Sequence, residues 1–591
     1  MGVPKLRSHL EPYASPVQFI SGQTSENSYS RRVIVDGPGL AYFIYHQLRS
    51  SKSRSENRSE AAPSYQELGT AVILWLESLQ SFDLEIAHIF FDGFLPESKK
   101  PTRISRLEDY RSKLVKIKTL NSDRSAYSLM NPVQLSDLLL RKSNDLPAPP
   151  FLVPAVIECL SNSSFSAVTE VVSGEADNFC AATVFQDGGI ILTSDSDLLV
   201  YDLRGRGSVI FFDDLTSTNH STASILKGVA YQTSSIASRL GLKRLLPLAF
   251  TLSEDPGKSF VSLINASRSV DEAEASFSNF EQNYLIDIPN GLQPDIEPLL
   301  KRLDPRISEY ILQILPHTRS PPHKADAHVS FAEYDIYLPF LIEDPDKAAA
   351  WAMGTPIRHL LYSLTPNPAS RVHEHFRKGQ RISRTEYVPF TLEETVSSCS
   401  ALSETIATTL GDFKDYATPV AWRALGLLEV LRSLLEENKS LPPVCDIEAV
   451  LSGRAVGVGW SVLHLYARVQ AYLYSLRMLR QSVDVFITAQ NSLDERLISA
   501  LKPLQTQLGD MPELATLFPE LTRKSGEGEC GVRVSKMFEA LGLQEPSEQG
   551  FTGHKGKKKK GRKGLKKEGE VESTPSPSST NMYNLLSLDK S

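Results

Sequence analysis

Acidic residues stand at the carboxyl ends of the short apolar segments in the first half of this chain. These segments are rich in β-branched residues and alternate with amphipathic stretches, which is typical of buried strands separated by helices. The strands are expected at 31–36, 85–93, 165–173, 189–195 and 207–212. The acids that end or closely follow four of them are Asp36, Asp92, Glu175, Asp177, Asp195 and Asp197. This alternation predicts an α/β fold with a parallel sheet flanked by helices.

These acids need a partner because close carboxylates repel each other, and burial increases the cost. The candidates are a cation, a basic residue, or water on an exposed loop. Asp195 and Asp197 point the same way if the chain stays extended there. Glu175 is expected just before a helix and Asp177 in its first turn. A single Asp at a strand end is usually a turn former or a helix cap, but six at equivalent positions favour a metal site, since ligands bind outside the carboxyl ends of parallel strands.

A site made only of carboxylates, without His or Cys, suits Mg²⁺ or Mn²⁺ better than Zn²⁺. Two such ions about 4 Å apart can activate a water and stabilise the leaving oxygen of a phosphodiester. The sequence therefore predicts a site for two Mg²⁺ or Mn²⁺ ions that serves phosphodiester hydrolysis.

Charge is unevenly distributed along the chain. The net charge is −7, yet residues 555–567 carry nine basic side chains, so the remaining residues carry −16. The folded part must therefore contact nucleic acid through a local basic patch. The basic run favours a nuclear localisation, or both a nuclear and a cytoplasmic one; a nonspecific nucleic-acid arm and solubilising charge are its other interpretations. No apolar run approaches the roughly 20 residues that span a bilayer, so no membrane association is expected.

Changes in composition and Pro-rich breaks suggest that the chain has three regions. Residues 1–259 hold the predicted sheet, with a polar, low-complexity insertion at about 48–64 that is expected to be disordered. Residues 260–545 contain long amphipathic segments between Pro-rich breaks, which predicts a mostly helical region with possible protein partners, and 546–591 form a Lys-rich tail expected to be disordered. The aromatic-rich stretch 464–476 is interpreted as helical core and not as a base-stacking platform.

The N-terminal half resembles the XPG/flap-endonuclease superfamily, whose nuclease core is PIN-like. The resemblance covers about residues 1–255 and rests on "MGVPKL", "VIVDG", "FFDG", "GEAD" and "TSDSDLLVY" in this order. The short segment between "FFDG" and "GEAD" and the long helical C-terminal region make it most similar to the asteroid branch of fungal type. Glycines of the superfamily's duplex-gripping helix-hairpin-helix are reduced to "DPGK" at 255–258, so the resemblance implies single strands, overhangs or flaps as substrates.

The resemblance also implies roles for individual residues. The six acids match the family's metal ligands, and Asp255 in "LSEDP" matches a seventh, with Ser253 and Pro256 replacing the family's Gly and Tyr. Lys99 and Arg106 match the pair that holds the scissile phosphate. Pro101 is expected at the start of a helix, which leaves Lys99 before it, so Lys100, Arg103 and Arg106 form a second candidate set. The structural alternative for this segment is a solvated basic helix.

Taken together, these residues predict a Mg²⁺-dependent, structure-specific endonuclease that acts on DNA, with a role in DNA repair. Two alternatives remain at this point. The chain could be a catalytically weak or inactive scaffold or signalling protein that reuses the fold, or a nuclease directed at RNA.

Overall fold

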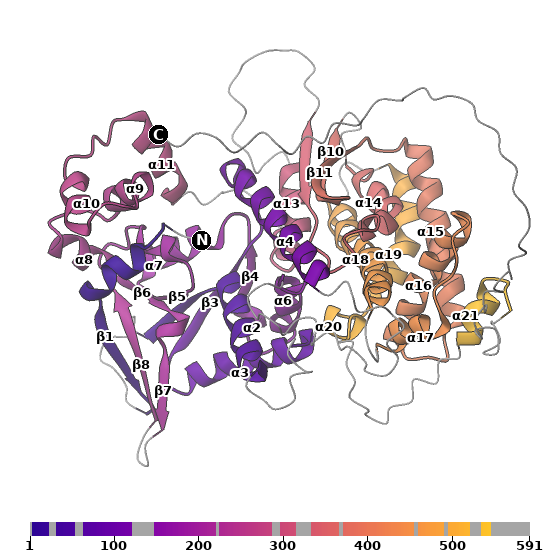
Figure 1. Ribbon diagram of the computed structural model, residues 1–591, viewed down its shortest axis with the longest axis horizontal. Helices are drawn as coiled ribbons and strands as arrows, with labels where there is room; N and C mark the ends of the chain where they lie inside the picture. Colours follow the sequence, from indigo (N-terminus) through magenta and orange to yellow (C-terminus); the bar gives the residue numbers. More distant parts are fainter. Residues whose placement is uncertain are drawn as a thin grey trace, which may run out of the picture. The chain divides into compact units, whose positions relative to one another are not determined.

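The computed structural model describes several stretches of the chain, and the account below concerns these residues alone. They are 3–22, 31–53, 63–120, 147–219, 224–286, 296–314, 332–365, 370–453, 459–489, 494–519 and 534–544. All of them belong to one compact unit within Met1–Glu545 (Figure 1). The predicted tail, with its basic run, lies outside the described residues. The predicted division at 259/260 falls within the compact unit and stays a prediction.

A mixed sheet organises the first half of the chain. The order of its hydrogen-bonded strands is β1-β8-β6-β5-β2-β3-β4, and β7 pairs with β8. The strands are β1 (Ser15–Ile20), β2 (Arg32–Asp36), β3 (Glu85–Asp92), β4 (Thr169–Val172), β5 (Gly189–Thr193), β6 (Gly207–Phe211), β7 (Thr216–Asn219) and β8 (Ser224–Tyr231). The strands from β6 to β4 run parallel, which confirms the predicted α/β fold.

Helices cover both faces of this sheet because its central strands send apolar side chains to both sides. Val35 and Phe91 are buried in the core under one face, and Ile34 and Phe90 in the core under the other. The helices on the first face are α2 (Gly37–Ser53), α3 (Tyr65–Gln80) and α6 (Leu152–Ser161), and those on the second are α1 (Leu6–Leu10), α7 (Ala176–Asp187), α8 (Thr233–Arg239), α9 (Leu246–Glu254), α10 (Phe260–Ser267) and α11 (Ala275–Glu281).

One edge of the sheet is antiparallel, which the sequence did not predict. β8 pairs antiparallel with β1, β6 and β7. The pairing of β1 with β8 joins Ser15 to Ala230 and Ile20 to Ile225. Partners this far apart leave no local turn pattern between them, so the sequence alone could not reveal the pairing.

Helices dominate the second half, as predicted. They are α12 (Glu297–Leu300), α13 (Pro305–Ile314), α14 (Thr355–Tyr362), α15 (Leu392–Asp412), α16 (Thr418–Glu436), α17 (Val444–Ser452), α18 (Trp460–Thr488), α19 (Glu495–Gly509), α20 (Leu514–Leu517) and α21 (Val534–Ala540). Helix α18 is buried around most of its circumference, as expected of a central core helix. Tyr472 and Tyr474 lie in this core, which confirms the interpretation of the aromatic stretch.

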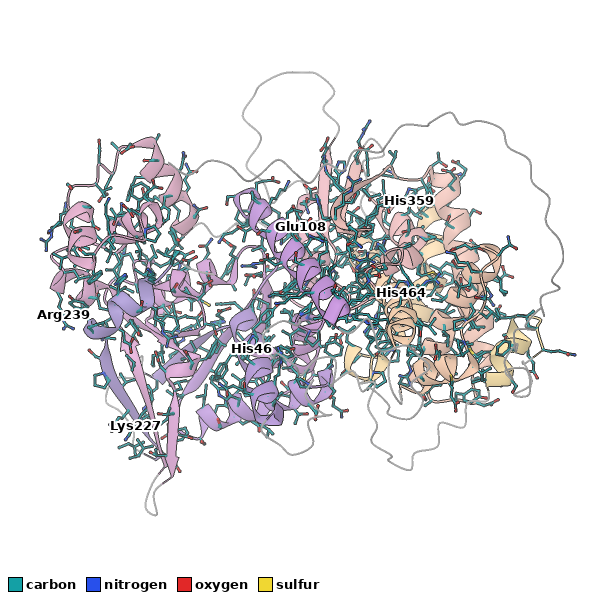
Figure 2. The ribbon with its side chains drawn as sticks, in the orientation of Figure 1. His46, Glu108, Lys227, Arg239, His359 and His464 are labelled. Carbon is teal, nitrogen blue, oxygen red and sulfur yellow. The ribbon has the colours of Figure 1, made fainter. Side chains whose placement is uncertain are left out.

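A three-stranded sheet, which the sequence did not predict, lies within this helical half. Its order is β11-β10-β9, with β9 (Glu333–Tyr337), β10 (Arg371–Lys378) and β11 (Arg381–Tyr387). Helix α4 (Lys100–Leu120) contacts this sheet. Glu108 of α4, which is labelled in Figure 2, accepts a hydrogen bond of 3.0 Å from the backbone N–H of Ile382. The small sheet therefore joins α4 to the helical half.

The first residues of the insertion expected at 48–64 are helical, and its last residue caps the next helix. Helix α2 continues to Ser53, and Ser64 caps α3 through a reciprocal hydrogen-bond pair with Glu67, the arrangement known as a capping box. Residues 54–62 lie outside the described part of the chain. No helix in the described residues is long and apolar enough to cross a membrane.

Candidate active site

Asp36 ends β2 and is 5% exposed. Its Oδ1 accepts a hydrogen bond of 3.0 Å from Gly39 N, and its Oδ2 accepts one of 2.7 Å from Thr193 Oγ1. A Cβ atom on Gly39 would lie 2.3 Å from Asp36 Oδ2, so only glycine leaves room for the carboxylate. These contacts fix Asp36 between the end of β2 and the end of β5.

Asp92 ends β3 and holds the start of α7. Its Oδ1 accepts a hydrogen bond of 2.8 Å from Ala176 N, one of the first-turn N–H groups that lack a partner inside a helix. Glu175 is the N-cap residue of α7 and Asp177 lies in its first turn, as predicted. The positive end of the α7 dipole therefore lies beside these carboxylates, which favours their charged forms.

Asp195 and Asp197 are held by a turn, not by the extended chain that we expected. A 3-10 helix, η6 (Ser196–Leu199), begins directly after Asp195. Asp195 Oδ1 accepts a hydrogen bond of 3.0 Å from Asp197 N, an Asx-type turn of the kind that Asp side chains favour. The strand ends at Thr193, so the two acids are placed by the turn that follows β5.

Burial and mutual repulsion disfavour the charged forms of the acids. Burial first, and then the charges of Asp92 and Asp195, raise the pKa of Asp36 to about 6. Burial and the charge of Asp195 raise the pKa of Asp197 to about 6. Burial, followed by the charges of Asp36 and Asp195, raises the pKa of Asp177 well above its usual range. Acids from β2, β3, α7 and the turn after β5 thus form one electrostatic cluster, which a cation would stabilise.

Lys99, one of the predicted basic residues, lies beside this cluster of acids. It ends a short 3-10 helix, η4 (Glu97–Lys99), and so precedes α4 as expected. Lys99 Nζ lies 3.3 Å from Glu175 Oε1. Burial raises the pKa of Glu175, and the charge of Lys99 opposes that rise. Lys99 therefore supplies a positive charge at the edge of the carboxylate cluster.

The donor set of the cluster has the chemistry that a hard divalent cation prefers, because every predicted ligand offers carboxylate oxygen. The positions of these side chains, however, do not match the coordination of an ion. Among the residues that the structure describes, no group of three or more His, Cys, Asp or Glu is arranged so that it could hold one ion as it stands. Hydrogen bonds from Gly39, Thr193 and Ala176 engage the Asp36 and Asp92 carboxylates instead. Binding of an ion would require the carboxylates to turn toward a common centre.

The second candidate phosphate set is mostly engaged by the helical half of the protein. Lys100 Nζ lies 2.6 Å from Asp335 Oδ2, and Arg103 lies 2.6 Å from Glu309 Oε1. Arg106, in contrast, is exposed on α4 and lines a cavity together with Asp92. Of the basic residues singled out on η4 and α4, the charges of Lys99, Arg103 and Arg106 thus all act on Asp92, although Arg103 is also paired with Glu309, whereas Lys100 is paired with Asp335.

Among the described residues, Asp255 makes its polar contacts with neighbours in its own loop and not with the other six acids. It follows α9, its carboxylate is about half exposed, and it pairs with Lys258 at 3.3 Å. Its Oδ1 also accepts a 3.3 Å hydrogen bond from Gly257 N. These contacts lie within its own loop, so its role as a seventh metal ligand stays a prediction.

Two contacts at the site escaped the sequence analysis. Asp197 Oδ1 accepts a hydrogen bond of 2.8 Å from Val3 N and one of 3.3 Å from the Tyr284 hydroxyl. The first comes from a backbone group and carries no side-chain signal. The second comes from a Tyr in a polar stretch far along the chain, where no motif marks it.

Comparisons with known proteins agree with this architecture. A family model described as "XPG domain containing" matches residues 148–388, from α6 through β11. The chain is also similar to Asteroid homolog 1 of Schizosaccharomyces pombe, with 24% identity over 419 residues that cover 67% of this chain and 69% of that protein. The fold, the acids at its strand ends and these matches agree with one another: over residues 148–388 the chain is similar to the XPG-domain family, and more distantly, over 419 residues, it is similar to Asteroid homolog 1.

Proposed function

We propose that this protein is a divalent-cation-dependent nuclease that hydrolyses phosphodiester bonds of DNA. One observation carries the proposal: buried acids from four separate elements interact electrostatically at one edge of the sheet, beside Lys99 and Arg106. A cluster that raises the pKa values of its own members is costly for a fold unless a cation binds there. The match to the XPG family supports a nucleic acid as the substrate.

Roles follow from the positions of the side chains. The ligands for two Mg²⁺ or Mn²⁺ ions would be Asp36, Asp92, Glu175, Asp177, Asp195 and Asp197, with Asp255 as the seventh. Bound ions would supply Lewis acidity and a water of lowered pKa. Lys99 and Arg106 would hold the scissile phosphate by charge-assisted hydrogen bonds. By positioning the phosphate, these two side chains would favour in-line attack of the water on the phosphorus.

Cleavage assays test the proposal directly. We expect purified protein to cut single-stranded, overhang or flap DNA in Mg²⁺ or Mn²⁺ and to lose this activity in excess EDTA. A matched panel of DNA and RNA oligonucleotides decides between the two polymers, and end-labelling gives the polarity. Absence of cutting from every substrate in both metals would contradict the nuclease assignment.

The alternative of a non-catalytic scaffold gains support from one observation, namely that the described acids are not arranged around an ion as they stand. The two functions differ in a binding measurement. If the acids bind metal, Mn²⁺ at one hundred times its Kd should stabilise the folded state by about 2.7 kcal/mol. Thermal unfolding with and without millimolar Mg²⁺ or Mn²⁺, with Ca²⁺ and K⁺ as comparisons, measures this. An unfolding temperature that none of the divalent ions changes would favour the scaffold.

The location and partners of the protein are further proposals. Nuclear localisation rests on the basic run 555–567, and a role in DNA repair rests on the nuclease proposal and on this location. Protein partners of the helical half are likewise proposed from its size alone. Fluorescent fusions with and without residues 546–591 test the localisation.

A further inference from the structure

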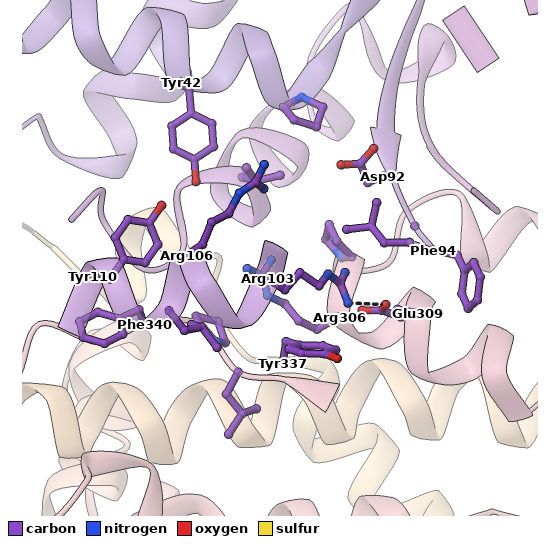
Figure 3. A pocket seen from close by; sticks show the side chains of 18 residues that line it. Tyr42, Asp92, Phe94, Arg103, Arg106, Tyr110, Arg306, Glu309, Tyr337 and Phe340 are labelled. Carbon is purple, nitrogen blue, oxygen red and sulfur yellow. Dashed lines mark hydrogen bonds and ion pairs between the residues drawn. The ribbon is translucent and has the colours of Figure 1, made fainter. Parts of the chain in front are cut away.

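A cavity of about 250 Å³ lies directly beside the carboxylate cluster, and both halves of the protein form its walls. Asp92 and the following Gly93 border it on the side of the nuclease sheet, and Arg106 reaches it from α4. Arg306 of α13 and the segment 337–340, which begins at the last residue of β9, close it from the helical half (Figure 3). The cavity is therefore continuous with the proposed active site but is built in part by residues of the helical half.

The cavity carries surplus positive charge. Three arginines line it against two carboxylates. One of these carboxylates is already neutralised, because Glu309 pairs with Arg103 at 2.6 Å, and the Arg103 guanidinium lies 4.5 Å from the centroid of the Tyr337 ring. In the part of the chain that the structure describes, no ion pair engages Arg106 or Arg306. The guanidinium groups of Arg106 and Arg306 thus face the cavity, and the remaining acid in its lining is Asp92.

Aromatic rings form the rest of the lining. Tyr110 and Phe340 lie 5.8 Å apart at their centroids, and Tyr42 and Phe94 add further ring surface. In Figure 3 the Tyr42 and Tyr110 rings lie on the side of Arg106, and Tyr337 lies below Arg103 and Glu309. Guanidinium groups bind phosphates with two parallel hydrogen bonds, and aromatic rings stack on nucleobases, each stack contributing about 1–3 kcal/mol.

The size of the cavity limits what can enter. At about 250 Å³ it falls just below the range of roughly 300–1,000 Å³ that is typical of small-molecule sites. A duplex or a folded strand cannot fit, whereas one unpaired nucleotide has the right chemistry: a phosphate for the arginines and a base for the rings. The position beside Asp92 would place that nucleotide next to the bond that is cut.

We propose that this cavity binds one unpaired nucleotide of the substrate, with its phosphate on Arg306 and its base against the rings of Tyr110 and Phe340. The role of the nucleotide rests on the proposed nuclease function, but its binding does not require cleavage. Arg306 is then a substrate-binding residue that the helical half contributes to the nuclease site. Requirement for an unpaired nucleotide gives the enzyme its preference for single-stranded regions.

Binding of a single nucleotide to the full chain in metal-free buffer tests the proposal. The probe is deoxyadenosine 5′-monophosphate, followed by ligand-observed NMR, with deoxyadenosine and inorganic phosphate as the two separate halves of the ligand. We expect the nucleotide to bind more tightly than either half, and Arg306→Gln to weaken it at least tenfold. Arg302→Gln is the matched control, because Arg302 is exposed and lies outside this cavity; it should change the affinity less than twofold.

Two further measurements distinguish loss of nucleotide binding from misfolding of the variant. Thermal unfolding shows whether Arg306→Gln folds; if it does not, Arg306→Lys, which keeps the charge but loses the two-pronged hydrogen bond, should still weaken binding severalfold. Nucleotide binding that is absent from the wild type, or equal in wild type and folded Arg306 variants, overturns the proposal. A protein that binds the nucleotide through Arg306 yet cuts no DNA would retain the cavity assignment and refute the nuclease.

Discussion

Replacement of Asp195 and Asp197 together by Ala is expected to lower metal-dependent cleavage by about a thousandfold or more. These two acids follow the same strand and form one turn, in which Asp195 Oδ1 accepts a hydrogen bond from Asp197 N. Their loss removes two of the proposed ligands at once. Metal ions contribute several kcal/mol of charge stabilisation in phosphoryl transfer, and each 1.4 kcal/mol corresponds to about tenfold in rate. Initial rates of cleavage at saturating Mn²⁺ measure the effect.

The same variant should fold at least as well as the wild type in metal-free buffer. Burial holds the pKa of Asp197 above its usual value, so at neutral pH the ionised carboxylate costs folding free energy, and its removal relieves that cost. Asp202→Ala is the matched control, because Asp202 is exposed and, among the described residues, accepts a hydrogen bond within its own turn, from Arg204 N. A double variant that cuts DNA at the wild-type rate would place catalysis elsewhere, and one that unfolds would reveal a structural role for the pair.

The acids of the site could be found from the sequence because each lies within a local pattern. Asp36 and Asp92 end apolar, β-branched segments, and the strands end where the pattern ends. The start of α7 was predictable as well, since an apolar helical segment follows Glu175. Parallel strands then bring their carboxyl ends to one edge by topology alone. Local periodicity and topology therefore sufficed to assemble these positions without any long-range information.

The features that escaped prediction depend on contacts between distant residues. The carboxyls that neutralise Lys100 and Arg103 come from Asp335 and Glu309, more than 200 residues further along the chain. Nothing in "ESKKPTRISR" distinguishes these two cations from Lys99 or Arg106. The same holds for the cavity, whose residue Arg306 lies in a segment that reads as an ordinary amphipathic helix. A basic helix reveals its charges in the sequence, but only the packing shows which of them stay available for a phosphate.

A buried ion pair, Arg358 with Glu374, supports the packing of the helical half, and its disruption is expected to have a large effect on stability. Arg358 of α14 and Glu374 of β10 are both fully buried and form two hydrogen bonds, of 2.6 and 3.0 Å. Arg358 also donates to Ser475 Oγ of α18 at 2.9 Å, and the Tyr362 hydroxyl donates to Glu374 at 2.5 Å. The pair therefore ties α14 and β10 to the central helix. Glu374→Ala leaves a buried guanidinium without its counter-charge, which typically costs about 3–5 kcal/mol.

We accordingly expect Glu374→Ala to lower the free energy of unfolding by about 3–5 kcal/mol in urea titrations. Glu386→Ala is the matched control: Glu386 lies on the neighbouring strand β11 and pairs with Arg371 at 2.9 Å, but the two side chains are 44% and 38% exposed. Such surface pairs contribute about 0–1 kcal/mol. Replacement of both buried partners, as Arg358→Met with Glu374→Leu, should cost less than Glu374→Ala alone, because no charge is left unpaired.

Equal losses for Glu374→Ala and Glu386→Ala would contradict a desolvated pair and would indicate that water reaches Arg358. The result also bears on the cavity. Leu338, in the segment that closes it, donates its backbone N–H to the carbonyl of His375 at 3.1 Å, and His375 directly follows Glu374 on β10. Loss of the buried pair should therefore weaken nucleotide binding as well as stability, even though neither member of the pair touches the ligand. A variant that is destabilised but binds the nucleotide at the wild-type affinity would show that the cavity wall is held independently of β10.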